Sequence, residues 1–303
     1  MRNNKSGLTM SIIFKADSAN FGEGTGNVAT LKKFTRGDGK QYTYISRQAI
    51  HHDIIEEMNE AKAKLILAGD SNKSAIQYAP KATIKDSSDI DLSGYMKTVK
   101  EKNSTFRSAV MRISNAISLE PYNGDMDFLT NAGLANRMRK ETGDDSINNN
   151  IAQTEMHRSY YAYTISIDLD KIGIDDNDNI ELDDEEKYRR VAKVLRVVKY
   201  LYRDIKARRE DFEPLFVVGG VYDLKSAFFE NALKLNDNLG LDLTAIKSVL
   251  TDPEIAKDTE AGLARGIFNN DNEVEKELNP ETITEFFTNL TKKVADFYEV
   301  QGN

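Results

Sequence analysis

The sequence predicts an α+β fold of the split βαβ, ferredoxin-like type, and three patterns carry this prediction. Apolar and polar residues alternate over 8–14 and again over 160–169, which is typical of half-buried strands. Apolar residues recur with helical spacing over 49–65 and 191–205. When the polar segments between them are set aside, the elements run strand, helix, strand, strand, helix, strand, which is the split βαβ order.

In the first half of the chain, each predicted element has its own local signal. Ser46 has the side chain of a helix N-cap, and Gly69 that of a helix end. Glycine-rich and Asn-rich stretches indicate loops and turns. The predicted elements are a strand over 8–14, a Gly/Asn-rich loop over 19–27, a turn over 37–40, a strand over 42–45, a helix from Ser46 to Gly69, and a strand over 106–119 that is irregular near Ser114-Asn115.

The second half begins with the strongest strand pattern in the sequence, over 160–169. A helix with one Lys/Arg face follows over 191–205, and then a buried strand over 215–222 that is interrupted by Gly219-Gly220. Asn279-Pro280-Glu281 indicates the start of a last helix.

The length of 303 residues suits a single elaborated domain, since domains commonly have roughly 100–200 residues. Two polar stretches interrupt the predicted elements and are expected to be insertions: an inserted lobe over 70–104 and an Asn-rich extension over 133–157. The C-terminal part, 224–303, is expected to be mainly helical.

The composition excludes several classes of site. The chain has no Cys, which rules out a disulfide scaffold, a thiolate zinc site, an Fe–S cluster and a cysteine nucleophile. No apolar run approaches the roughly 18 residues of a membrane helix, and the first residues lack the apolar core of a signal peptide. We therefore expect a soluble protein in the cytoplasm that does not act at a membrane.

The charge is unevenly distributed along the chain. The net charge is −8, and the segment 170–186 alone holds nine acidic residues and one Lys. The segment 187–209 holds ten basic residues and one Asp, and 32–52 holds five basic residues and one Asp. Segregated charge of this kind can bind a polyanion locally, because fields are screened within roughly 8 Å. The alternative is that these runs are solvated surface.

Motifs for catalysis, metals and cofactors are absent. Gly22, Gly24 and Gly26 lack the spacing and the following helix of a dinucleotide site. The acidic run lacks the glycine and spacing of a calcium loop. His51 and His52 are consecutive on a predicted helix, so they point about 100° apart and cannot share an ion. We predict no catalytic residue, no metal and no cofactor.

The predicted helix start at Ser46-Arg47-Gln48 is more informative. A cation in the first turn of a helix opposes the helix dipole, so an anion held there by free N–H groups, by Arg47 and by the Ser46 hydroxyl would explain it. Arg47 extending into water is the alternative. A Gly-rich loop with several polar and basic residues precedes this turn, among them Asn20, Asn27, Lys32 and Lys33. Gly219-Gly220 would also permit close approach of a ligand, or form a bulge.

These residues resemble a known family. The stretch NFGEGTGN, the following LKK, and DGKQYTYISRQAIHHDI are similar to the N-terminal signature of the crRNA-binding backbone subunits of CRISPR Cascade, the Cas-seven family. Together with DFLTNAGLANRM, they resemble the type I-B, DevR branch. The residue-level match is confined to about 15–52 and 124–139, and the aromatic RNP1 pattern of ordinary RNA-recognition motifs is absent.

The resemblance implies an RRM-like palm, a finger lobe over 70–104, a thumb over 133–157, and copies stacked head to tail along a guide RNA. It implies a non-catalytic subunit whose partners are the guide crRNA, target DNA through guide pairing, other copies of itself and other Cascade subunits. It implies mainly sequence-tolerant binding to the RNA backbone. The residues expected to bind RNA are Asn20, Asn27, Lys32, Lys33, Tyr44, Ser46, Arg47, Gln48, His51, Arg137, Arg139, Gly219 and Gly220.

Two other functions remain open from the sequence. One is an endoribonuclease of the same superfamily that processes guide precursors, with His51 or His157 as general base. The other is a protein-binding scaffold that uses the acidic segment and carries no RNA.

Overall fold

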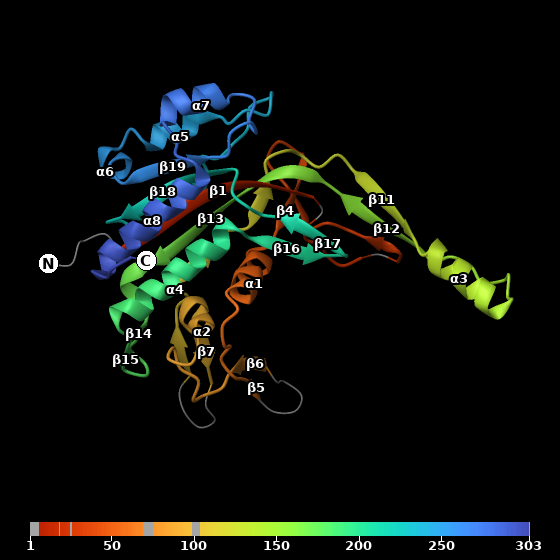
Figure 1. Cartoon of the computed structure of the whole chain (residues 1–303), viewed down its shortest axis with the longest axis horizontal. Helices are drawn as coiled ribbons and strands as arrows, with labels where there is room; N and C mark the ends of the chain where they lie inside the picture. The colour runs from red at the N-terminus through yellow and green to blue at the C-terminus, as the bar shows by residue number, and fades with distance from the viewer. Residues whose placement is uncertain (1–5, 18, 25, 69–74, 99–103, 303) are drawn as a thin grey trace.

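The computed structural model describes residues 6–17, 19–24, 26–68, 75–98 and 104–302, and its centre is an eight-stranded antiparallel sheet (Figure 1). The long strand β1 pairs with β13 on one side and with β18 on the other. Across the sheet, the strands are β19 (Thr259–Leu263), β18 (Phe216–Tyr222), β1 (Gly7–Asp17), β13 (Arg158–Asp168), β10 (Ala116–Ser118), β4 (Gln41–Ile45) and β3 (Lys33–Thr35), with β9 (Met111–Ile113) also beside β13.

The alternating patterns in the sequence are confirmed as the central strands. β1 and β13 pair along their whole length, from Gly7 opposite Asp168 to Asp17 opposite Arg158. The predicted irregularity near Ser114-Asn115 is the break between β9 and β10. One face of β1 presents Leu8, Met10, Ile12 and Phe14 to the main core, as the period of two in a strand requires.

Three helices cover that face: α1 (Arg47–Glu57), α4 (Asp184–Lys199) and α8 (Ile283–Tyr298). Their buried residues recur with the helical period. In chain order, β1 is followed by α1 and β9, and β13 is followed by α4 and β18. The order of neighbours in the sheet is β18, β1, β13, β9. The connection through α1 therefore runs from β1 past β13 to β9, and the connection through α4 runs from β13 past β1 to β18.

The C-terminal part forms a second layer on the opposite face (Figure 1). Three short helices pack there over Ile13, Phe216 and Val218: α5 (Leu243–Val249), α6 (Pro253–Ala256) and α7 (Asp271–Leu278). The region 224–303 thus holds four helices and the edge strand β19, among them α8 on the first face.

A small lobe follows α1 and has its own apolar cluster, which includes Ala82, Ile84, Ile90 and Tyr95. We define it as residues 65–107, of which 69–74 and 99–103 lie outside the described residues. Its elements are β5 (Leu65–Ala68), β6 (Ala75–Tyr78), α2 (Ser88–Ser93), β7 (Tyr95–Lys97) and β8 (Thr105–Arg107).

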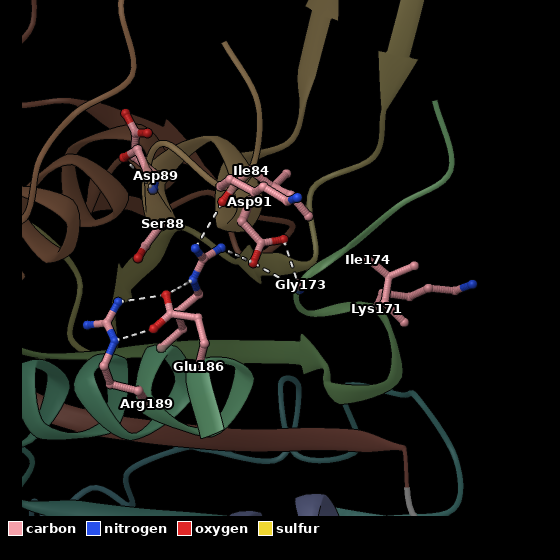
Figure 2. A network of polar contacts seen from close by, with 12 residues as sticks. Ile84, Ser88, Asp89, Asp91, Lys171, Gly173, Ile174, Glu186 and Arg189 are labelled. Atoms are coloured by element: carbon pink, nitrogen blue, oxygen red, sulfur yellow. Dashed lines mark hydrogen bonds and ion pairs between the residues drawn. The ribbon is translucent and has the colours of Figure 1, made fainter. Parts of the chain in front are cut away.

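A buried charge cluster holds the small lobe against the sheet layer (Figure 2). The carboxylate of Asp91, which is fully buried, accepts hydrogen bonds from Arg107 of the small lobe at 2.6 Å and from Arg190 of α4 at 2.8 Å. It also accepts from the backbone N–H of Gly173 at 3.0 Å. The Arg190 guanidinium in turn donates to Glu186 at 2.7 Å.

The acidic segment after β13 lies at the same junction. It contains a 3₁₀ turn (Leu169–Lys171) and the hairpin β14 (Ile174–Asp175) and β15 (Ile180–Glu181). The hydroxyl of Tyr95 in the small lobe donates to Asp175 at 2.9 Å, and Lys97 lies 3.4 Å from Asp178. Asp175 and Asp178 of the acidic segment therefore help to dock the small lobe.

A long arm projects from one end of the molecule (Figure 1). It consists of the antiparallel pair β11 (Asp125–Thr130) and β12 (Ile151–Met156), with α3 (Ala132–Thr142) at its far end. The strand β2 (Val28–Ala29) of the Gly-rich loop pairs with β12. We define the long arm as 125–156, so it starts earlier than the extension predicted over 133–157.

Two predicted helices are too long. α1 ends at Glu57, because Asn59 adopts a left-handed φ of 47° and turns the chain away. Ala61 and Leu65, expected on its apolar face, are exposed. α4 ends at Lys199, and the chain then forms a hairpin of β16 (Tyr202–Ile205) and β17 (Arg208–Asp211).

The start of the last helix is shifted from its predicted place. Asn279, with φ of 45°, ends α7, and α8 begins after the N-cap Thr282, which forms a capping box with Glu285. The helix itself is present, and Phe286, Leu290 and Val294 are buried on one of its faces.

Candidate nucleic-acid interface

The tip of α1 presents two polar side chains to solvent. Ser46 is the N-cap, and its hydroxyl oxygen accepts a hydrogen bond from the Ala49 N–H at 3.4 Å, as predicted for a capping serine. Arg47 and Gln48 follow in the first turn and are exposed. The first turn holds no acidic residue, so nothing in it offsets the charge of Arg47.

The backbone at this tip is already hydrogen-bonded, which corrects the expectation of free N–H groups. The Ser46 N–H donates to Asn20 Oδ1 at 3.0 Å, and the Arg47 N–H donates to Asn115 Oδ1 at 2.8 Å. Ser46 is buried and Asn20 half-buried, so both act in holding the turn. An anion at this tip would therefore meet the side chains of Arg47 and Gln48.

Asn115 was missed by reasoning from the sequence. It lies in the break between β9 and β10, and the Arg47 N–H that donates to it is 68 residues away in the sequence. The predicted irregularity at Ser114-Asn115 was the available signal, but nothing local indicates which amide such a side chain will reach.

The Gly-rich loop folds back on itself before it reaches α1. The Gly22 N–H donates to the Thr30 carbonyl at 2.8 Å, and the Lys32 N–H donates to the Asn20 carbonyl at 3.1 Å. Gly24 is required here, because a Cβ at this position would stand 2.7 Å from the Val28 carbonyl oxygen. The loop thus brings its backbone close to itself, beside the α1 tip.

The loop is also attached to the long arm. The exposed Asn27 accepts a backbone hydrogen bond from Gln153 at 2.9 Å. Lys33 lies 2.5 Å from Glu155 of β12 and 4.5 Å from the centre of the Tyr122 ring. Glu155 also accepts from the Leu31 N–H at 2.7 Å. Lys33 is therefore engaged in fixing the loop to the arm, whereas it was predicted to bind phosphate.

The remaining polar residues near the loop are half-buried or exposed. Lys32 is half-buried, and it forms no ion pair with any residue in the described ranges. Tyr44 is half-buried, with its ring 5.9 Å from that of Phe34. Arg36 is exposed, and its guanidinium lies 4.1 Å from the centre of the Tyr42 ring. Aromatic groups on β3 and β4, and cationic groups at the two ends of β3, thus lie next to the loop.

The two candidate histidines are engaged elsewhere. His51 lies 3.2 Å from Ser93 Oγ at the end of α2, so it faces the small lobe. His157 lies 2.8 Å from Thr43 Oγ1 and is buried at the root of the arm. Burial lowers the pKa of both imidazoles, more strongly than nearby carboxylates raise it. The geometry therefore gives no support to either as a general base at the α1 tip.

Arg137 and Arg139 are not brought to the α1 tip. Both lie on α3, at the far end of the long arm (Figure 1). Arg137 is exposed and lies 3.3 Å from Glu141, and Arg139 donates to the Ile147 carbonyl and to Asn136. If they contact RNA, they do so at a different place from Arg47.

The prediction for Gly219 and Gly220 is wrong. Both are buried in β18, in the middle of the sheet. A Cβ on Gly219 would stand 2.1 Å from the Thr9 carbonyl oxygen, and one on Gly220 would stand 2.0 Å from the Asp258 carbonyl oxygen. The close approach that these glycines permit is made by the protein's own backbone.

Most of the basic run over 187–209 is neutralised by carboxylates. Of its ten basic residues, seven form ion pairs within the chain. These seven are Lys187, Arg189, Arg190, Lys193, Arg203, Arg208 and Arg209. The run is therefore mainly structural, and the large positive charge counted from the sequence overstates what it offers to a polyanion.

Two further findings concern the part of the chain that the structure describes. Within it, no three His, Asp or Glu side chains are grouped so that they could hold a metal ion. None of its helices has the length and apolar character needed to cross a membrane.

The fold is similar to that of chains in two solved structures. It is similar to a chain of a "CRISPR RNA-guided surveillance complex, pre-nicking", with a TM-score of 0.62, 14% identity, and coverage of 96% of this chain and 100% of that one. A chain of a second CRISPR RNA-guided surveillance complex has a TM-score of 0.56, 17% identity, and coverage of 96% and 99%.

The family follows from the sequence match. The model of the family described as CRISPR-associated negative auto-regulator DevR/Csa2 matches residues 8–238, and the protein belongs to this family. A curated relative from Myxococcus xanthus (strain DK1622), "CRISPR-associated protein Cas7/Cst2/DevR", is 27% identical over 155 residues, which cover 47% of this chain. The match spans about half of that relative, 50% of its length.

Proposed function

We propose that this protein is a non-catalytic backbone subunit of a type I-B CRISPR Cascade surveillance complex. In this role it binds the sugar–phosphate backbone of the guide crRNA and stacks with further copies along it. Its other partners are the remaining Cascade subunits and, through guide pairing, target DNA; it would act in the cytoplasm. Family membership and the similarity to chains of RNA-guided complexes support this assignment.

The observation that carries the proposal is the exposed pair Arg47-Gln48 at the tip of α1. The turn is held rigid by Ser46, Asn20 and Asn115, so the guanidinium is presented on a fixed element beside the Gly-rich loop. A positioned Arg can bind a phosphate through two parallel hydrogen bonds. Such contacts carry no base information, which suits a subunit that accepts guides of any sequence.

The topology supports an RRM/ferredoxin-like palm. The neighbour order β18, β1, β13, β9 with two helices on one face is that of a split βαβ sheet. In this assignment, the small lobe is the finger and the long arm is the thumb. The palm then carries the guide at the α1 tip, and the two extensions reach neighbouring molecules.

Exposed apolar side chains support assembly through the two extensions. Among the described residues, eleven of the fifteen large exposed hydrophobic side chains lie on the small lobe or the long arm. The eleven are Leu65, Leu67, Ile76, Met96, Phe106, Met126, Phe128, Leu129, Leu134, Met138 and Ile151. Apolar surface of this kind is typical of interaction sites. Figure 1 shows the two extensions projecting in different directions, so a contact between the small lobe of one copy and the long arm of the next would join copies head to tail.

The test is RNA binding by Arg47→Glu. We expect affinity for single-stranded RNA to fall by at least about tenfold, since charge reversal at one phosphate contact costs about 1.4 kcal/mol or more. Filament length on a guide RNA should shorten in parallel. The matched control is Arg196→Glu, an exposed Arg on α4 that forms no ion pair with the described residues.

Three outcomes would contradict the proposal. The purified protein could show no nucleic acid by its 260/280 nm absorbance ratio and no binding to added RNA, which would favour a protein scaffold. Arg47→Glu could bind RNA like the parent, which would remove the α1 tip from the interface. Discrete cleavage of a repeat-containing transcript, lost in His51→Ala or His157→Ala, would favour the endoribonuclease.

A further inference from the structure

The hairpin of β16 and β17 ends in a strained turn. Its two central residues, Lys206 and Ala207, have φ of 48° and 62°, the left-handed region in which tight hairpin turns usually place Asn or Gly. Neither residue has a side chain that favours this region, so the turn costs free energy that the surrounding contacts must offset. Strain of this kind persists where the rest of the structure determines the backbone, and it often accompanies a functional position.

Contacts along its strands hold the hairpin against α1 and the end of β1. Arg203 of β16 donates to Asp53 of α1 at 2.7 Å. Glu210 of β17 accepts the Asp17 N–H, at the end of β1, at 2.9 Å. Arg208 lies 3.3 Å from Glu210 and 3.6 Å from Asp17. Its turn is thereby fixed over the root of the Gly-rich loop, and Figure 1 shows the hairpin pointing toward the base of the long arm.

The turn places the Lys206 ammonium where the loop meets the arm. Lys206 Nζ lies 3.7 Å from the centre of the Phe21 ring, in the loop, and 3.2 Å from Thr154 Oγ1, on β12. The ring and the hydroxyl orient the ammonium without neutralising it. The residue is nevertheless exposed, so a ligand can reach it from solvent.

Lys206 differs from its neighbours in having no carboxylate partner in the described part of the chain. Arg209 pairs with Asp204 at 2.8 Å, and Arg208 pairs with Glu210, so two of the three carboxylates of the hairpin are used by the two arginines. The third, that of Asp211, accepts the Glu213 N–H at 2.8 Å. Partial burial lowers the pKa of Lys206, and the nearby Arg208 adds to this. The Lys206 ammonium is held in place near Arg208 and has no carboxylate partner among the described residues. Such an environment favours the binding of an anion from outside the protein.

We propose that Lys206 binds a backbone phosphate of single-stranded RNA at the junction of the Gly-rich loop and the long arm. This inference rests on the proposed function and adds a contact to the same interface. It lies on a hairpin whose first strand, β16, was predicted as the end of a helix. The strained turn has the role of projecting the ammonium across the loop toward β12.

The experiment compares Lys206→Met with Arg209→Met by fluorescence anisotropy, with a labelled single-stranded RNA of arbitrary sequence as the probe. Methionine keeps an unbranched apolar side chain over Phe21 and removes the charge. We expect Lys206→Met to weaken binding about threefold to tenfold at low salt, and to reduce the slope of log affinity against log salt by about 0.7, the value for one lost phosphate contact on a single strand. Arg209→Met, an exposed Arg of the same hairpin that is already paired, should leave both unchanged.

The outcomes separate this inference from the proposed function. If the parent protein and Arg209→Met bind RNA and Lys206→Met matches them in affinity and salt slope, the Lys206 inference is overturned and the proposed function stands. If Lys206→Met lowers the melting temperature but leaves the salt slope unchanged, Lys206 only fastens the arm, and the inference is again overturned. If the parent protein does not bind the probe at any salt concentration, the proposed function fails first and this inference with it.

Discussion

Two charged regions of this protein differ in what their charges do. Around Asp91, at the junction of the small lobe and the sheet layer, the carboxylate is fully buried and two arginines, Arg107 and Arg190, are nearly so. At the tip of α1 and on the neighbouring hairpin, Arg47 and Lys206 are exposed, and no carboxylate among the described residues pairs with them.

The difference separates structural charge from charge that is available to a partner. A buried charge is tolerated only when it is paired and hydrogen-bonded, so the Asp91 cluster fixes the position of the small lobe. An exposed cation needs no internal partner and can exchange its counterions for phosphates. The local density of Lys and Arg in the sequence does not distinguish the two, since the densest basic run is largely neutralised.

The largest expected effect is at the buried cluster. Asp91→Ala leaves two arginines facing each other without their shared anion, and we expect a loss of about 3–5 kcal/mol in the free energy of unfolding. Denaturant titration followed by circular dichroism measures it. The control, Asp170→Ala, breaks the partly exposed pair with Lys225 and should cost less than about 1 kcal/mol. Similar losses for the two variants would contradict the distinction between the regions.

At the α1 tip, we expect one variant to lower the stability of the fold and another to lower RNA affinity without destabilising the fold. Ser46→Ala removes the cap and should cost about 1 kcal/mol of stability. Arg47→Ala should change stability by less than about 0.5 kcal/mol, because the side chain is exposed and unpaired with the described residues. Thermal melts and RNA titrations on both variants test this. A destabilised Arg47→Ala would mean that this cation, too, is structural.

Relief of strain in the β16–β17 turn should stabilise the protein slightly. Ala207→Gly removes the cost of a left-handed alanine, offset by the greater freedom of glycine in the unfolded chain, for a net gain of about 0.5 kcal/mol. RNA affinity should be unchanged, because the position of Lys206 is kept. A melting temperature below that of the parent would show that the turn is not strained.

The smallest expected effect is a pH dependence of the free energy of unfolding, caused by His51 near the small lobe and His157 at the base of the long arm. Burial lowers the folded-state pKa of His51 and His157, so the unfolded chain takes up protons first as the pH falls. Stability therefore decreases as the pH drops through the unfolded value of about 6.5, by at most about 0.4 kcal/mol per histidine at that pH. The double variant His51→Gln/His157→Gln should flatten the profile between pH 7.5 and 6. An unchanged slope would contradict these pKa directions.

Several elements could be predicted because their signals are short-range. Alternation over a few residues identified β1 and β13, and an apolar run identified the buried strand β18. The capping role of Ser46 follows from its side chain and the residues next to it. Arg47 was expected at an exposed position in the first turn, and it is exposed.

Other features could not be predicted, because they depend on contacts between distant segments. The apolar spacing continues beyond Glu57 and Lys199, yet the chain leaves the helix at both places. Gly219 and Gly220 suggested a ligand, whereas they accommodate the backbone of neighbouring segments. Lys33 was expected to bind phosphate, but it forms an ion pair with Glu155, which is 122 residues away in the sequence.

Local chemistry, then, settles which residues form strands, where a helix is capped and where a cation stands in its first turn, because each depends on neighbours along the chain. Which charges remain for a partner is decided when distant segments meet. Asp91 and Arg190 are separated by 99 residues, and only folding brings the carboxylate and the guanidinium out of water together. Electrostatic pairing acts through space, and so the electrostatic character of the interface follows from the folded arrangement.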